Sequence, residues 1–198
     1  MVTAREVESV FVEAGAFREG HFTLASGKHS PRYLEKFQVL QWPARTAALC
    51  ADIAAWARSL TPRTVAGPTT GGIILAHEVA RQMDLRAVYA ERAESSKGRE
   101  FRRGFALGSG ERVLVVDDIM TTGGSVQETI DAVRGAGALV VGAAVLVDRS
   151  GGTASLDVPL HALWTLDIPT FAPGDCPQCA EGVPLTKPGT TPAQVVRQ

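Results

Sequence analysis

The sequence predicts an α/β fold in which a mostly parallel sheet is flanked by helices. Two observations support this prediction. Short apolar segments alternate along the chain with segments that have helical periodicity. The most apolar segments, residues 113–116 and 139–147, also lack the polar alternation of a strand that faces water on one side. Strands of this kind are buried on both faces, so helices are expected above and below the sheet.

The composition is that of one globular domain. The chain has 198 residues, of which 45% are hydrophobic and 21% are charged, and its formal net charge is −1. This charge gives no reason to expect nucleic acid or an acidic membrane as a partner. The longest apolar run, residues 138–147, is too short to span a bilayer. Three cysteines do not make a disulfide framework, so we expect a reducing, cytoplasmic location.

The first 60 residues of the chain contain two helical patterns separated by an irregular stretch. Residues 7–14 repeat apolar side chains at helical spacing. Residues 43–60 do so again, and Pro43 suits the first turn of a helix. Residues 17–40 contain glycines and a proline and are expected to form short strands and turns.

The rest of the chain alternates between strand and helix patterns. Residues 92–104 are polar and basic and are expected to form a long mobile loop, and the chain after Pro169 is expected to be irregular. The expected strands are 63–66, 87–91, 113–116 and 139–147, and the expected helices are 73–83 and 125–134.

Residues 113–125 read Val-Leu-Val-Val-Asp-Asp-Ile-Met-Thr-Thr-Gly-Gly-Ser and contain the most informative chemistry. Asp117 and Asp118 follow an apolar strand at the sheet edge where open α/β sheets bind ligands, and their side chains are expected to face opposite ways. Ser125 and Glu128 have the spacing of a capping box, which would begin a helix at Ser125. A glycine-rich loop before a helix binds phosphate. One ligand with a phosphate and a sugar diol would suit both the loop and the carboxylates.

This segment resembles the phosphoribosyl pyrophosphate (PRPP) motif of the type I phosphoribosyltransferases. The resemblance implies their fold, a central mostly parallel sheet flanked by helices and accompanied by a small hood. It also implies that the two aspartates hold the ribose hydroxyls and that the loop holds the 5′-phosphate. Residues 67–76 look like the turn and helix on the pyrophosphate side of the site. The implied PRPP-binding residues are Thr69, Thr70, Gly71, Asp117, Asp118, Ile119, Met120, Thr121, Thr122, Gly123, Gly124 and Ser125.

Two further segments resemble the orotate branch of this family. Residues 22–30 read Phe-Thr-Leu-Ala-Ser-Gly-Lys-His-Ser and are similar to the segment that forms a hood over the base. Residues 147–152 match a strand that ends in Asp-Arg, and the guanidinium of Arg149 suits a carboxylate or a ring carbonyl. The orotate-binding residues that the resemblance implies are Thr121, Arg149, Ser26, Gly27 and Lys28.

Residues 92–104 are expected to bring cations to the leaving pyrophosphate. Negative charge grows on that group in the transition state, and cations closing over it would stabilise the charge and exclude water. In the orotate family such a loop acts on a neighbouring subunit's site, so the resemblance implies a homodimer. Here the loop has no histidine, and Ala25 and Gly71 replace lysines of better-known members. The implied catalytic residues are Arg92, Lys97, Arg99, Asp117 and Asp118.

As a whole, the resemblance implies one domain over residues 1–198, with a PRPP-binding core over about 43–150 and a hood from about 17–42 plus C-terminal residues. The implied reaction transfers the phosphoribosyl group of PRPP to orotate, giving orotidine 5′-monophosphate and pyrophosphate in pyrimidine biosynthesis. Mg²⁺ is expected to be held mainly through PRPP, with no direct protein ligand. Two alternatives stay open: a purine or uracil phosphoribosyltransferase, and a non-catalytic regulator that senses PRPP.

A single CxxC pair, Cys176 and Cys179, stands near the C-terminus. Structural zinc takes four ligands. His161 is a candidate for one of the other two, but the sequence offers no clear set, so we expect a tight turn with two free thiols. His21 and His29 lie near the implied hood, where they could contact the bound substrate, but we expect them to be partly exposed polar residues.

Overall fold

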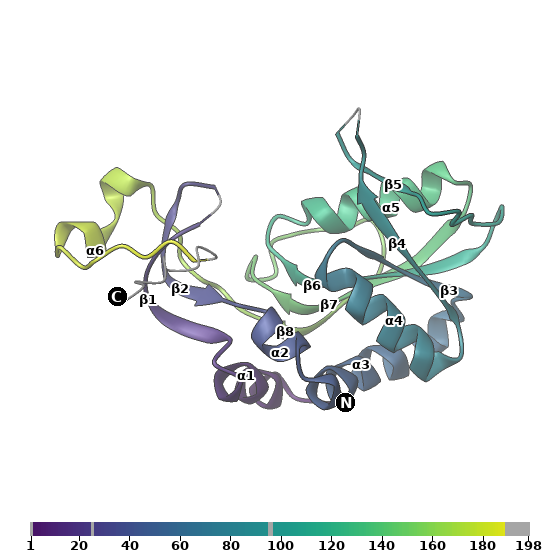
Figure 1. The fold of residues 1–198 in the computed structure, drawn as a ribbon, viewed down its shortest axis with the longest axis horizontal. Coiled ribbons are helices and arrows are strands. Elements are labelled where there is room, and N and C mark those ends of the chain that lie inside the picture. The colour runs from purple at the N-terminus through teal and green to yellow at the C-terminus, as the bar shows by residue number, and fades with distance from the viewer. Residues whose placement is uncertain (1, 25, 95–96, 189–198) are drawn as a thin grey trace, which may run out of the picture.

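The computed structural model describes residues 2–24, 26–94 and 97–188, and it confirms the α/β architecture (Figure 1). The main sheet has six strands, and all neighbours in it are parallel except the edge pair formed by β4 and β5. The central strands are nearly continuous apolar runs, as burial on both faces requires. In sheet order the strands are β5 (Arg99–Phe101), β4 (Arg86–Arg92), β3 (Thr64–Pro68), β6 (Arg112–Met120), β7 (Leu139–Asp148) and β8 (Leu160–Thr165).

Helices cover both faces of this sheet. Helices α1 (Ala4–Glu13), α3 (Pro43–Ala57) and α4 (Gly71–Met83) share one apolar cluster with the sheet, and α5 (Gly124–Gly135) forms a second cluster on the other face. The short helices α2 (Phe37–Leu40) and η1 (Arg58–Leu60) lie on either side of α3 in the chain. No helix of the described residues is long and apolar enough to cross a membrane.

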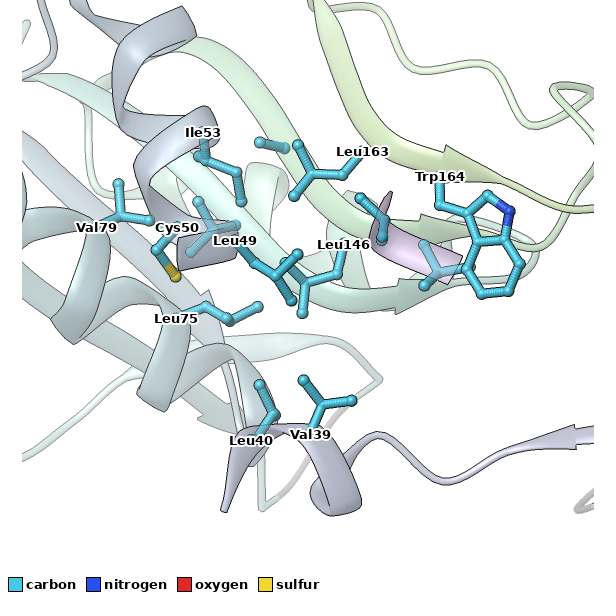
Figure 2. Close-up of a cluster of buried hydrophobic side chains, with 14 of the residues drawn as sticks. Val39, Leu40, Leu49, Cys50, Ile53, Leu75, Val79, Leu146, Leu163 and Trp164 are labelled. Atoms are coloured by element: carbon cyan, nitrogen blue, oxygen red, sulfur yellow. The ribbon is translucent and has the colours of Figure 1, made fainter. Parts of the chain in front are cut away.

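The alternation of side chains along β6 connects these two clusters. Leu114 and Val116 belong to the cluster with α3 and α4, whereas Val113 and Val115 belong to the cluster with α5. Figure 2 shows the first cluster, in which side chains of α3 and α4 surround Leu146 of β7. The same alternation continues to the end of β6, where it decides which way Asp117 and Asp118 face.

The hood is built from two distant parts of the chain. Strands β1 (Phe17–Thr23) and β2 (His29–Leu34) form a separate antiparallel sheet. The C-terminal segment, with η2 (Pro173–Asp175) and α6 (Pro177–Ala180), lies beside it (Figure 1). His29 and Phe171 exchange backbone hydrogen bonds of 2.9 Å, and Thr23 N donates to the carbonyl of Thr186 at 2.9 Å.

Two segments differ from the sequence prediction. Residues 92–104 are not a loop throughout, because they contain β5, which pairs with β4 in a hairpin that projects from the sheet (Figure 1). Charged side chains of this hairpin pair with each other, as Arg103 does with Glu91 at 2.9 Å, and this makes a charged segment compatible with a strand. Strand β8 was not predicted. It lies at the sheet edge and is only partly buried, so its sequence lacks the apolar run of a central strand.

The predicted capping box at the start of α5 is wrong. The helix begins at Gly124, and its N-cap is Gly123, whose φ of 83° is in the left-handed region that favours glycine. No side chain caps the helix in the described structure. Ser125 and Glu128 instead face a cation, because the Arg99 guanidinium donates to Ser125 Oγ at 3.2 Å and lies 3.5 Å from Glu128 Oε2. The helix N-terminus is therefore left open toward the loop.

Candidate active site

A cavity of about 120 Å³ opens where β6 ends and α5 begins. The uncapped N–H groups of α5 and the positive end of its dipole make this cavity suitable for an anion. Met120 is 1% exposed and its side chain belongs to the apolar cluster under α5, so it meets a ligand mainly through its backbone. The cavity is lined by Asp117, Ile119, Met120, Thr121, Thr122, Gly123, Gly124, Ser125 and Val126.

Asp117 and Asp118 face opposite ways, as their positions on a strand predict. Asp117 lines the phosphate-binding cavity. Asp118 turns to the other face of the sheet, where its Oδ1 accepts a hydrogen bond from Lys36 Nζ at 2.9 Å. The second oxygen of Asp118, Oδ2, is buried and has no hydrogen-bond partner in the described structure.

Burial makes both carboxyl groups weaker acids than an exposed aspartate. It raises the pKa of Asp117 to about 7, with a further contribution from the negative charge of Asp118. Burial also raises the pKa of Asp118, while Lys36 acts in the opposite direction. Among the described residues, Asp118 Oδ2 is a buried acceptor without a hydrogen-bond partner, and leaving such an oxygen unpaired is costly.

The turn between β3 and α4 lies directly against Asp118. A Cβ atom on Gly71 would stand 1.8 Å from Asp118 Oδ2, and one on Gly67 would stand 2.1 Å from the carbonyl oxygen of Gly72. The sequence can therefore place only glycine at these two positions in this arrangement. The turn contains the predicted residues Thr69 and Thr70, and the peptide bond between them is cis. The expected pyrophosphate-side turn and the ribose-side carboxylates thus meet at one sheet edge.

Arg99 joins this turn to the phosphate-binding loop. Its guanidinium donates to Thr69 Oγ1 at 3.3 Å and to Ser125 Oγ at 3.2 Å, and its side chain is only 3% exposed. Of the predicted loop cations, Arg99 is the one that these contacts bring to the site. Arg92 and Lys97 are exposed on the projecting hairpin, and no hydrogen bond or ion pair within the described ranges ties them to the loop.

Arg149 follows β7 and is tied to the end of β6. Its backbone N–H donates to the carbonyl of Met120 at 2.8 Å, which holds the residue beside the loop. Burial lowers the pKa of its guanidinium, and Tyr33 acts in the opposite direction. The buried Nε has no hydrogen-bond partner among the residues described. A largely buried guanidinium with an unused donor is suited to a carboxylate ligand.

The predicted hood contacts are not brought to the site. Ser26, Gly27 and Lys28 are exposed at the tip of the β1–β2 hairpin, and within the described chain no hydrogen bond or ion pair joins them to Thr121 or Arg149. The position of Ala25, which replaces a family lysine, lies outside the described residues.

Lys36 is the site residue that sequence reasoning missed. It lies 82 positions before Asp118, outside every recognised motif, and reaches the carboxylate from the segment between β2 and α2. The sequence offered one signal for such a residue. Positions 25 and 71 carry no lysine, and a buried carboxylate pair without those cations needs a cation from another part of the chain.

Comparison with known proteins agrees with this geometry. The sequence model described as "Phosphoribosyl transferase domain" matches residues 38–160, and the chain belongs to this phosphoribosyltransferase family. The chain is therefore a transferase enzyme with the type I phosphoribosyltransferase fold, and the predicted fold class is confirmed.

Relatives narrow the family to its orotate branch, the orotate phosphoribosyltransferases. The chain is 46% identical to the orotate phosphoribosyltransferase of Pelotomaculum thermopropionicum over 189 residues, which cover 96% of this chain and 98% of that relative. It is 47% identical to the orotate phosphoribosyltransferase of Desulforamulus reducens over 185 residues, 93% of this chain and 96% of that relative. The resemblance inferred from the motifs is thereby confirmed.

Solved structures give the same picture. The orotate phosphoribosyltransferase of Aeropyrum pernix superposes with a TM-score of 0.69 at 28% identity, covering 81% of this chain and 93% of that chain. An adenine phosphoribosyltransferase superposes with a TM-score of 0.63 at 16% identity, covering 79% of this chain and 98% of that chain, and this likeness shows the fold alone.

Proposed function

We propose that this site transfers the 5-phosphoribosyl group of PRPP to orotate, forming orotidine 5′-monophosphate and pyrophosphate in pyrimidine biosynthesis. The observation that supports this most directly is the junction at the end of β6. There an uncapped helix N-terminus, two buried carboxylates and the half-buried Arg149 lie at one sheet edge. The names of the curated relatives support the same reaction.

Each part of PRPP has a partner in this arrangement. The loop from Thr121 to Ser125 and the N–H groups of α5 bind the 5′-phosphate. Asp117 and Asp118 accept hydrogen bonds from the ribose hydroxyls. The turn at Thr69–Gly71 and the Arg99 guanidinium face the pyrophosphate, where negative charge increases during the reaction.

The donor set also fits Mg²⁺. Hard divalent cations prefer oxygen ligands, and the two carboxyl groups at the end of β6 place oxygen atoms beside the position of the ribose. Mg²⁺ held mainly by pyrophosphate and ribose oxygens, with these aspartates beneath the ribose, would supply positive charge that helps pyrophosphate to leave. Arg99, between the two anion-binding segments, adds a cation from the chain itself.

Orotate is bound through its carboxylate by Arg149, which orients the ring N1 toward the ribose carbon. The bond from that carbon to pyrophosphate breaks with both electrons leaving on pyrophosphate, while N1 forms the new bond and gives up its proton to the departing pyrophosphate or to water. The ribosyl centre resembles an oxocarbenium ion, as in glycoside cleavage. The protein needs no nucleophile of its own, because binding, orientation and charge stabilisation account for its part.

We extend the proposal to a cytoplasmic homodimer in which each chain forms one domain over residues 1–198, with its hood over about 17–42 and the C-terminal residues. The hairpin β4–β5 projects from the sheet (Figure 1) and exposes Arg92 and Lys97, as a segment that reaches a neighbouring subunit would. The three cysteines are free, which suits a reducing compartment.

The reaction is tested by incubating the protein with PRPP, Mg²⁺ and orotate, adenine, hypoxanthine or uracil in turn, while ultraviolet absorbance reports loss of each base. We expect only orotate to be consumed. Consumption of a purine or of uracil with orotate untouched would support a different phosphoribosyltransferase. PRPP binding without turnover of any base would support a PRPP-sensing regulator.

Arg149→Gln tests the acceptor site separately from the PRPP site. Loss of a charged hydrogen bond of about 1.5–3 kcal/mol raises the KM for orotate by about 10- to 150-fold, with a much smaller change for PRPP. Arg5→Gln, at an exposed position on α1, is the matched control and leaves both constants unchanged. Equal KM values for orotate in the two variants would remove Arg149 from the proposal.

A further inference from the structure

Four metal-binding side chains converge in the hood, away from the PRPP site. His21 comes from β1, His29 from the start of β2, and Cys176 and Cys179 from the C-terminal segment. One ligand atom of each lies within 4.8 Å of all the others. The two histidines are 3% and 6% exposed, so the expectation that they are partly exposed polar residues is wrong. The expected turn with two free thiols is present, but it faces these two imidazoles.

Hydrogen bonding alone does not explain this cluster. His21 Nδ1 lies 2.8 Å from the carbonyl oxygen of Val183, which can only accept, so Nδ1 bears the proton. In the neutral ring, Nε2 then offers a single lone pair. Three groups surround that nitrogen: His29 Nδ1 at 3.1 Å, Cys176 Sγ at 3.4 Å and Cys179 Sγ at 3.7 Å. One lone pair serves one donor, whereas a cation at the centre would use all four ligand atoms.

The distances match those around tetrahedral zinc. With Zn–N near 2.0 Å and Zn–S near 2.3 Å, tetrahedral geometry places two nitrogens about 3.3 Å apart and a nitrogen and a sulfur about 3.5 Å apart. The two imidazole nitrogens are 3.1 Å apart, three of the four nitrogen–sulfur distances are 3.4, 3.7 and 3.2 Å, and all four ligand atoms lie within 4.8 Å of one another. The CxxC spacing is also the usual one for the cysteine pair of a structural zinc site.

We propose that His21, His29, Cys176 and Cys179 form a structural zinc site that fastens the C-terminal segment to the hood. Four protein ligands complete the tetrahedron and leave no open position for a reacting water, which separates this site from a catalytic one. The Val183 carbonyl supplies the outer contact that orients a metal-bound histidine and fixes its tautomer.

The fold explains why a metal would be useful here. A two-stranded sheet is marginally stable by itself, and β1–β2 pairs with no strand of the main sheet. In the described part of the chain, the C-terminal segment adds two isolated bridges, at Phe22–Thr186 and His29–Phe171, and side-chain hydrogen bonds such as that of His21 to the Val183 carbonyl. A zinc ion bound by β1, β2 and the CxxC turn joins all three segments at one point, and its binding energy contributes directly to their folding.

The metal content of the untagged, full-length protein, purified under reducing conditions, tests the proposal. Mass spectrometry of metals is expected to find about one zinc per chain. Cys179→Ser is the main variant, because Cys179 is the exposed ligand and its replacement disturbs packing least; it should retain less than about a tenth of the zinc. Cys50→Ala and the exposed His77→Ala are matched controls for thiol and imidazole, and both should retain the metal.

A second measurement does not depend on any variant. The apo protein reconstituted with Co²⁺ should show the intense visible bands of a tetrahedral thiolate site, and addition of Zn²⁺ should abolish them. The proposal is overturned if the reduced wild-type protein contains no zinc and takes none up from added Zn²⁺. It is equally overturned if Cys176 and Cys179 form a disulfide in the purified protein, or if Cys179→Ser retains zinc at the wild-type level.

Discussion

Asp117 is expected to lower the stability of the protein at neutral pH, and Asp117→Asn should relieve this effect. Burial and the neighbouring Asp118 raise the pKa of Asp117 from 3.8 to about 7 in the folded chain. The folded state therefore binds this proton more tightly than the unfolded state does. The resulting stabilisation is complete below pH 3.8 and is lost as the pH rises through 7. The asparagine side chain does not lose a proton over this range, so the stability of the Asp117→Asn variant does not fall with this titration.

The size of the effect follows from the pKa shift. A change from 3.8 to about 7 is about 3 pKa units, which at 1.36 kcal/mol each corresponds to about 4 kcal/mol above pH 7. The amide oxygen of asparagine can still accept the hydrogen bond that Asp118 N now donates to Asp117 Oδ1 at 2.8 Å. We therefore expect the variant to gain up to about 4 kcal/mol over the wild type at pH 8 and much less at pH 5.

Urea unfolding of both proteins at pH 5 and pH 8, followed by tryptophan fluorescence, measures this difference. Protein concentration is held constant, and the buffers contain no phosphate, because phosphate would bind the loop and stabilise the folded state. Asp131→Asn, at an exposed position on α5, is the control and should show no pH-dependent gain. The reasoning is refuted if the difference between Asp117→Asn and the wild type is the same at both pH values. The same variant should use PRPP poorly, since the carboxylate serves ligand binding and not folding.

Three further predictions concern the rest of the site and the core. Lys36→Met leaves Asp118 without its cation, so the KM for PRPP at pH 7 should rise by about tenfold or more. Lys36→Arg keeps the charge and should have a KM for PRPP close to that of the wild type. Equal KM values for PRPP in the two variants would exclude a charge effect. Gly71→Ala brings a Cβ to 1.8 Å from Asp118 Oδ2 and should weaken PRPP binding as measured by calorimetry, whereas Gly135→Ala, with nothing within 4 Å, should not. Leu114→Ala empties a fully buried position of β6 and should lower the free energy of unfolding by about 2–5 kcal/mol in urea titrations; a loss below about 1 kcal/mol would contradict its place in the core.

The parts of this protein that the sequence predicts well are those whose determinants are contiguous. Strands β6 and β7 are apolar without interruption because both of their faces are buried, and this pattern is visible in the residues themselves. The loop over residues 121–125 could be predicted equally well, because the strand end, the glycines and the helix start follow one another within residues 113–125. Even the opposite orientation of the two aspartates follows from the period of a strand.

The features that escaped prediction depend on partners far along the chain or on a backbone angle. Lys36 meets Asp118 across 82 positions, and His21 meets Cys176 across 155, and no local pattern marks either contact. The helix α5 begins before Ser125 because Gly123 adopts a positive φ, which the capping-box spacing did not reveal. Strand β5 was hidden by its charges, because Glu100 pairs with Arg102 in the hairpin and Arg99 lies against Glu128 of α5.

The construction of the hood from both ends of the chain has a consequence for the order of events during synthesis. The last strand of the main sheet ends at Thr165, whereas the described hydrogen bonds that hold β1 and β2 from outside come from later residues, between Pro169 and Thr186. At about 5–20 residues per second, the ribosome needs roughly one to four seconds more to make the segment between Thr165 and Thr186. All strands of the main sheet are therefore synthesised before the contacts that complete the hood can form. A chain released in that interval would contain the whole main sheet and an incomplete hood.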